Sequence, residues 1–132
     1  MGIFSALRRT VIGEPIPLPG ELLRTFPELS VVQLRRGGLP VRVAGWSLLQ
    51  SSAAAITLWR FVFLGANVRA DAELLLHEFR HIQQFQASRV FPLLYLWESL
   101  RRGYHGNRFE LDAQRYAGAR LAEARRNQVE ER

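Results

Sequence analysis

Two histidines one helical turn apart enclose a glutamate in the segment "HEFRH", residues 77–81. On an α-helix each residue advances by about 100°, so His77 and His81 differ by only about 40° and project side by side. Two imidazoles in this arrangement can reach one zinc ion at about 2.0–2.1 Å each. Glu78 then flanks the metal without binding it, where it can accept a proton from a zinc-bound water. Because the full pattern is rare by chance, it predicts a zinc site in preference to a helix that merely carries polar residues.

A catalytic zinc site needs a third protein ligand and leaves one position for water. The remaining candidates are the third histidine and the downstream carboxylates, namely His105, Glu98, Glu110, Asp112 and Glu123. Helical phase separates two of them: Glu110 falls on an alanine-rich side of its helix, whereas Asp112 points with several arginines. A carboxylate on an apolar face needs a partner that offsets its desolvation, and zinc would be such a partner. Glu110 is therefore the first candidate and Asp112 the second.

Glu110 also has a purely structural interpretation. Asn107 and Glu110 have the spacing of a capping box, in which the glutamate side chain bonds back to the backbone amide of the N-cap residue. The sequence favours the ligand over the cap but leaves both open.

Composition limits the classes of protein that fit. The chain has 132 residues, 48% of them hydrophobic, which predicts a single folded domain over residues 1–132. It has no cysteine, so any metal must be held by histidine and carboxylate. All 18 basic residues are arginines dispersed along the sequence, so the net charge of +6 does not indicate a nucleic-acid surface. The sequence shows neither a secretory signal nor a stretch long enough to span a bilayer, so a cytoplasmic protein is expected, with peripheral membrane contact left open.

The order of expected elements predicts an α+β fold, with strands first and helices after them. Residues 1–30 include three alternating prolines and are expected to be an extended lead-in. Residues 31–65 are expected to form a small antiparallel sheet of about three strands. Two of these strands make a hairpin over residues 31–45, and residues 55–65 make the third. Residues 70–127 are expected to be helical.

Capping residues set the expected helix ends. Asp71 predicts the start of a first helix running to about Ser88, Pro92 opens a second that stops at Gly103, and Asn107 caps a third that runs through residue 124. The second helix lies in the apolar segment 90–100, which could line a cleft, contact lipid or form a dimer face. Burial against the first helix is the favoured interpretation.

With these residues in hand, the chain resembles the gluzincin metallopeptidases, especially their small members. "HEFRHIQQ" and "NRFELDA" are similar to the paired H-E-x-x-H-x-x-Q and N-P-F-E-x-E-A signatures of short bacterial metallopeptidases. The resemblance covers roughly residues 55–118. It implies a zincin-like core, with His77, His81 and Glu110 as the zinc ligands and Glu78 as the general base.

Two positions differ from the family signatures, and the resemblance also suggests two further catalytic candidates. Arg108 replaces the usual proline, and Gln114 stands where many relatives have an aspartate that orients a ligand histidine. Gluzincins also use a tyrosine or histidine to stabilise the tetrahedral intermediate, and Tyr104 and His105 are candidates for this catalytic role. A plain glycine-rich connector is an equally acceptable interpretation of that loop.

Three hypotheses from different classes follow. The first is a zinc-dependent hydrolase that acts on a peptide or protein substrate. The second is a zinc-binding regulatory or interaction domain of peptidase ancestry without useful turnover, which Gln114 and the small size favour. The third is a basic module that binds nucleic acid or membrane, in which the histidine pair is incidental.

Overall fold

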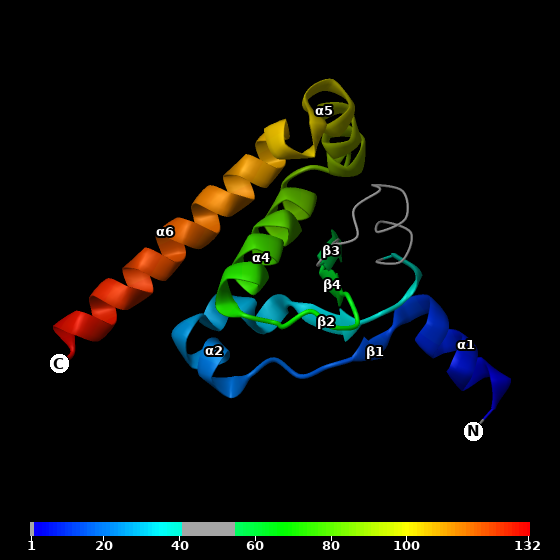
Figure 1. The fold of residues 1–132 in the computed structure, drawn as a ribbon, viewed down its shortest axis with the longest axis horizontal. Helices are drawn as coiled ribbons and strands as arrows, with labels where there is room; N and C mark the ends of the chain where they lie inside the picture. The colour runs from blue at the N-terminus through cyan, green and yellow to red at the C-terminus, as the bar shows by residue number, and fades with distance from the viewer. Residues whose placement is uncertain (1, 41–54) are drawn as a thin grey trace. The chain divides into compact units, whose positions relative to one another are not determined.

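The structure is a computed structural model that describes residues 2–40 and 55–132. Residue contacts divide the chain into two units, residues 1–70 and 71–132, and each is described by itself. The first unit contains the strands together with short helices, and the second contains three longer helices (Figure 1). This order confirms the α+β fold class.

Four strands of the first unit form one sheet with the order β1-β2-β4-β3. They are β1 (Glu14–Pro15), β2 (Gln33–Arg36), β3 (Ala55–Leu58) and β4 (Phe61–Leu64). β1 pairs with β2, and β3 with β4, in antiparallel fashion, whereas β2 and β4 run parallel. The predicted antiparallel sheet is therefore wrong in one pairing, because a parallel neighbour needs a long crossover connection that strand patterns do not reveal.

The segment 55–65, predicted as one strand, is a hairpin of β3 and β4 that turns at Trp59 and Arg60. Trp59 has a φ of 54°, in the left-handed region that turns of this kind need. The usual glycine or asparagine signal is missing there, which is why the sequence did not predict the turn. For the other predicted hairpin, Gly37 and Gly38 have positive φ, but the expected second strand at 41–45 lies outside the described residues.

The predicted extended lead-in is wrong for most of its length. It contains α1 (Ile3–Ile12), α2 (Gly20–Thr25) and the 3-10 helix η1 (Pro27–Val31). The prolines restrict the backbone only near themselves, so helices form on both sides of the extended segment 14–19. Gly13 ends α1 with a φ of 67°, and a Cβ there would lie 2.6 Å from the carbonyl oxygen of Arg36. Glycine is therefore required at this approach of backbone to backbone.

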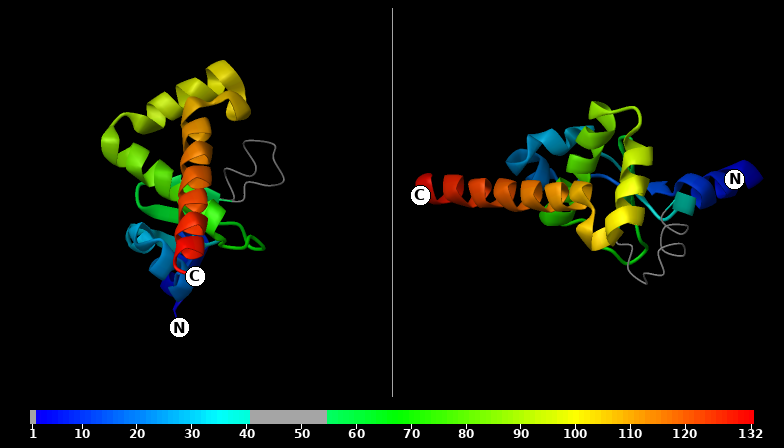
Figure 2. Two further views of the ribbon diagram at one scale, coloured as in Figure 1. Left: turned by 90° about the vertical axis from the view of Figure 1, so that its left-hand side faces the viewer. Right: turned by 90° about the horizontal axis from the view of Figure 1, so that it is seen from above.

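The second unit consists of α4 (Ala72–Ala87), α5 (Phe91–Gly106) and α6 (Arg108–Glu130). The predicted caps are confirmed: Asp71 accepts a hydrogen bond from the Leu74 amide at 2.8 Å, and Asn107 accepts one from the Phe109 amide at 2.9 Å. Gly103 breaks the helical backbone of α5 with a φ of 74°. α6 continues as one helix to Glu130, past the expected end at residue 124 (Figure 2).

Within this unit α4 packs mainly on α6, and α5 contacts both. The apolar residues Leu75, Phe79 and Ile82 of α4 are buried. On α6 the small residues Ala113 and Ala117 are buried. Short side chains let two helices approach closely, so polar side chains of α4 and α6 can meet.

α5 differs from the expectation that its apolar residues pack against the first helix. Its buried residues are Phe91 and Glu98, whereas several of its leucines and Trp97 are exposed. Phe91 contacts the Phe85 ring of α4 and the Phe109 ring of α6, with centroid distances of 4.6 and 5.0 Å. No helix among the described residues is both long enough and apolar enough to cross a membrane.

Candidate metal centre

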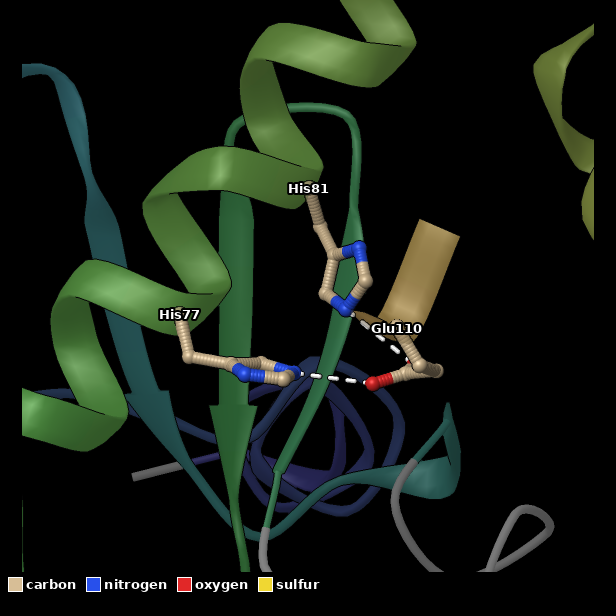
Figure 3. A group of neighbouring side chains, drawn as sticks. All are labelled: His77, His81 and Glu110. Carbon is tan, nitrogen blue, oxygen red and sulfur yellow. Dashed lines mark hydrogen bonds and ion pairs between the residues drawn. The ribbon is translucent and has the colours of Figure 1, made fainter. Parts of the chain in front are cut away.

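The structure brings three of the predicted site residues together within the second unit. His77 and His81 project from adjacent turns of α4 toward Glu110, which lies in the first turn of α6 (Figure 3). The Nε2 atom of His77 is 2.8 Å from Oε2 of Glu110, and the Nε2 atom of His81 is 3.1 Å from Oε1. One ligand atom from each residue lies within 4.8 Å of the other two. We call these three residues the inner cluster.

The inner cluster is largely shielded from water. The side chains of Glu110 and His81 are 5% and 7% exposed, and that of His77 is 16% exposed. An ionised carboxylate at such a position must be compensated by hydrogen bonds and positive charge. Glu110 obtains both from the two imidazoles, which explains how a carboxylate is tolerated on the packed side of α6.

The capping-box alternative for Glu110 does not describe the observed bonding. The backbone amide of Asn107 donates to the carbonyl oxygen of Tyr104 at 3.3 Å, and the Glu110 carboxylate points to the histidines. The Asn107 side chain is nevertheless important, because its Nδ2 donates to the carbonyl oxygen of Tyr95 and to Oγ of Ser99. Asn107 therefore caps α6 and joins it to α5. These contacts fix the start of α6, whose first turn contains Glu110.

Protonation of the inner cluster follows from these contacts. Burial by itself would lower the pKa of His81, but the hydrogen bond to Glu110 and the negative charges of Glu78 and Glu110 raise it to about 9. Burial would likewise raise the pKa of Glu110, but hydrogen bonds from His77 and His81 hold it well below its usual range. Without a metal, the cluster is thus a buried carboxylate paired with a protonated imidazole.

Gln84 fixes the orientation of the His81 ring. Its Oε1 accepts from Nδ1 of His81 at 2.8 Å, while its Nε2 donates to the carbonyl oxygen of Phe109 and to Oδ2 of Asp112. Because the amide nitrogen of Gln84 already has two acceptors, its oxygen must face His81, and Nδ1 must carry a proton. Nε2 of His81 is then the nitrogen left to ligate a metal, and it is the one directed at Glu110.

Asp112, the second candidate for the third ligand, lies outside the inner cluster. Arg80 of α4 donates to it through Nε at 2.8 Å, and its side chain is 44% exposed. The hydrogen bond from Arg80 lowers the pKa of Asp112. We call Arg80, Gln84 and Asp112 the outer cluster: it contacts the inner cluster through Gln84 and His81.

The remaining carboxylate candidates also lie elsewhere. Glu98 is buried, but its oxygens face Nε of Arg102 at 3.7 Å and Nε of Arg108 at 3.6 Å. Glu123 is exposed and pairs with Arg120. Gln114, at the position expected to orient a histidine, is exposed, so Gln84 has that contact instead.

Tyr95 of α5 is a site residue that the sequence did not predict. Its hydroxyl donates to Oε1 of Glu110 at 2.6 Å. Burial, together with the smaller effect of the Glu110 charge, raises the pKa of Tyr95 far above its usual value. The hydroxyl therefore stays protonated. The sequence feature that could have identified Tyr95 is its position in the apolar segment 90–100, because a tyrosine buried there needs a hydrogen-bond acceptor for its hydroxyl.

The two residues proposed for oxyanion stabilisation differ in position. Tyr104 is half-buried, and burial together with the charges of Glu110 and Glu78 raises its pKa to about 12. His105 is exposed and meets the Tyr104 ring edge-on at 5.5 Å. The electrostatic coupling to Glu110 thus associates Tyr104 with the inner cluster.

Glu78, predicted as the general base, is a buried carboxylate with 6% exposure. Its charge acts on His81, Tyr95 and Tyr104, which places it in the electrostatic environment of the inner cluster. Glu78 is not one of the three residues whose ligand atoms converge. The Glu78 carboxylate is thus separate from the three converging side chains, and its role beside a metal stays a prediction.

The donor set fits zinc better than the hard cations. Two imidazole nitrogens and one carboxylate oxygen form a ligand set of catalytic zinc sites, whereas calcium and magnesium prefer oxygen ligands alone. The buried surroundings and the fixed His81 tautomer also fit a metal that binds neutral imidazole.

Comparisons of the chain with protein families, with curated proteins and with solved structures find no match.

Proposed function

We propose that the chain is a zinc-dependent hydrolase, with a peptide or protein as its substrate. The observation that carries the proposal is the convergence of His77, His81 and Glu110, whose ligand atoms lie within 4.8 Å of one another beside the buried Glu78. Three protein ligands and an adjacent carboxylate are the parts that a hydrolytic zinc site needs. The peptide substrate is inferred from the resemblance to gluzincin metallopeptidases.

Zinc bound by three protein ligands would act as a Lewis acid and lower the pKa of a water in its remaining position. Glu78 would accept the proton of the attacking water and later deliver it to the leaving amine. Its burial keeps this carboxylate away from bulk water, on the same helix as the two histidines. Gln84 would accept a hydrogen bond from Nδ1 of His81, so that Nε2 of the ring is directed at the zinc.

Two tyrosines would support the chemistry in different ways. Tyr95 would hold the Glu110 carboxylate in place through its hydrogen bond of 2.6 Å. Tyr104 would donate a hydrogen bond to the oxygen that becomes negatively charged on the attacked carbonyl, because its pKa of about 12 keeps the hydroxyl protonated. We assign this role to Tyr104 and not to His105, which is exposed.

The test is a comparison of wild type with Glu78→Gln and with the control Glu73→Gln. Both substitutions make the same chemical change on α4, but Glu73 is exposed in the first turn. We expect all three proteins to bind zinc, and Glu78→Gln alone to lose about 10²–10⁴-fold in the rate of peptide cleavage. The measurements are zinc content by elemental analysis and cleavage of a peptide library, with chelated wild type as the blank.

Two results would count against the proposal. Cleavage by Glu78→Gln at the wild-type rate would remove the assigned mechanism. If wild type and Glu78→Gln hold zinc equally but neither cleaves any member of the library, the zinc-binding regulatory domain becomes the better account.

A further inference from the structure

The outward side of α5 is apolar, although its inward side carries the polar and charged residues. At 100° per residue, four large apolar side chains fall within an arc of about 100°. They are exposed by 69%, 55%, 61% and 76% and form what we call the outer face of α5: Leu93, Leu96, Trp97 and Leu100. Phe91, Tyr95 and Glu98 lie on the opposite side of the helix. A helix of a globular protein normally has the reverse arrangement, so the outer face is built for contact with something apolar.

Exposed arginines lie near both ends of the outer face of α5. Arg89 and Arg101 are exposed near its two ends. The one acidic residue of α5, Glu98, is buried and faces the guanidinium groups of Arg102 and Arg108. An apolar strip bordered by arginines complements an apolar surface that carries negative charge at its edge.

α1, in the other unit, has the same combination of features. It buries no residue, and its large apolar side chains project over one arc of the helix. These residues are exposed by 84%, 85%, 57% and 38% and form the outer face of α1: Ile3, Phe4, Leu7 and Val11. The helix contains Arg8 and Arg9 and no acidic residue, and Nε of Arg9 is 3.3 Å from Oε1 of Glu14, just past the end of the helix. Two helices from separate units therefore each present an exposed apolar face and also carry arginines.

We propose that the outer face of α5 and the outer face of α1 each bind the surface of an anionic lipid membrane. Amphipathic helices of this composition lie in the interface with the apolar side among the acyl chains and the arginines at the headgroups. Trp97 suits that depth, because indole rings favour the membrane–water interface. A second copy of the chain fits less well, since symmetric pairing through the outer face of α5 would bring Arg89 and Arg101 of both copies together.

The test is flotation of the full chain with phospholipid vesicles. We expect binding to vesicles of equal parts phosphatidylcholine and phosphatidylglycerol, weaker binding at high salt, and little binding to phosphatidylcholine alone. Leu100→Asp and Phe4→Asp should each lower the partition coefficient about tenfold or more, because each removes an apolar side chain that would enter the bilayer and adds a negative charge. Val129→Asp is the matched control, since Val129 of α6 is 74% exposed but belongs to neither face.

Circular dichroism should show that the variants keep the helix content and melting behaviour of wild type, since all the substituted positions are exposed. Equal binding by wild type, Leu100→Asp and Phe4→Asp would overturn the proposal, as would no binding of wild type to anionic vesicles. A dimer in light scattering that Leu100→Asp dissociates would replace the lipid with a second copy. The experiment needs neither zinc nor substrate, so its result is independent of the proposed hydrolase activity.

Discussion

The inner cluster and the outer cluster lie side by side between α4 and α6, and each is centred on a carboxylate of α6. Glu110 has a side chain that is 5% exposed and accepts from two imidazoles, whereas Asp112 is 44% exposed and accepts from Arg80. An imidazole can give up its proton and offer a lone pair to a metal, but a guanidinium cannot. The neighbours of a carboxylate, more than the carboxylate itself, thus decide whether it could serve as a metal ligand or only as a partner in an ion pair.

The largest expected effect comes from removing the two carboxylates one at a time. Glu110→Ala removes a proposed ligand, so it should weaken zinc binding by well beyond the roughly 10–100-fold that loss of an outer partner costs. Asp112→Ala should stay within that range, because Asp112 acts only through Gln84. Calorimetric zinc titration measures both. Equal losses, or a larger loss for Asp112→Ala, would show that the third ligand has been assigned to the wrong cluster.

The link between the clusters should have an intermediate effect. Gln84→Ala leaves Nδ1 of His81 without its acceptor, so the ring loses its orientation and zinc affinity should fall about 10–100-fold. Gln83→Ala is the matched control, because Gln83 accepts from Arg80 and is the neighbouring glutamine on α4. Competition with a chromophoric chelator gives both affinities. If the two variants bind zinc alike, the hydrogen bond between Gln84 and His81 does not position the ligand.

Zinc binding at the inner cluster should depend on pH, because the His81 imidazole can lose its proton. The metal-free protein holds a proton on His81 up to a pKa of about 9, and zinc must displace it. Affinity should therefore rise with pH by about tenfold per unit up to about pH 9 and then level off. Glu78→Gln removes a charge that raises this pKa, so the plateau should begin at lower pH. Zinc titrations in a series of buffers test this, and an affinity independent of pH from 6.5 to about 9 would contradict it.

The smallest effect is expected from the outer ion pair in the metal-free protein. Arg80 and Asp112 are partly exposed, so Asp112→Asn should lower the free energy of unfolding by at most about 1 kcal/mol. Urea denaturation at neutral pH measures it. A loss of several kcal/mol would mean that the outer cluster is as tightly coupled to the fold as the buried inner cluster.

Local signals in the sequence predicted the three long helices and which carboxylate of α6 is buried. Asp71 and Asn107 fixed two helix starts because a capping side chain bonds its own helix. Helical phase predicted that Glu110 is buried and Asp112 is not, because periodicity along one helix is independent of its neighbours.

Contacts between elements could not be predicted in the same way. Tyr95 reaches Glu110, and Gln84 reaches Asp112, only because three helices pack in one particular arrangement. The hairpin turn at Trp59 lacked the residue types that mark such turns. The parallel pairing of β2 with β4 likewise depends on a crossover that no local pattern encodes.

The central claim is that the inner cluster holds zinc, and its most direct test is a crystal grown with zinc and measured at the zinc absorption edge. We predict one anomalous peak in this unit, about 2.0–2.1 Å from Nε2 of both His77 and His81 and about 2.0–2.2 Å from a carboxylate oxygen of Glu110. The direct hydrogen bonds between the histidines and Glu110 should then be replaced by bonds to the metal. A peak at Asp112, Glu98 or His105, with those hydrogen bonds intact, would contradict the account.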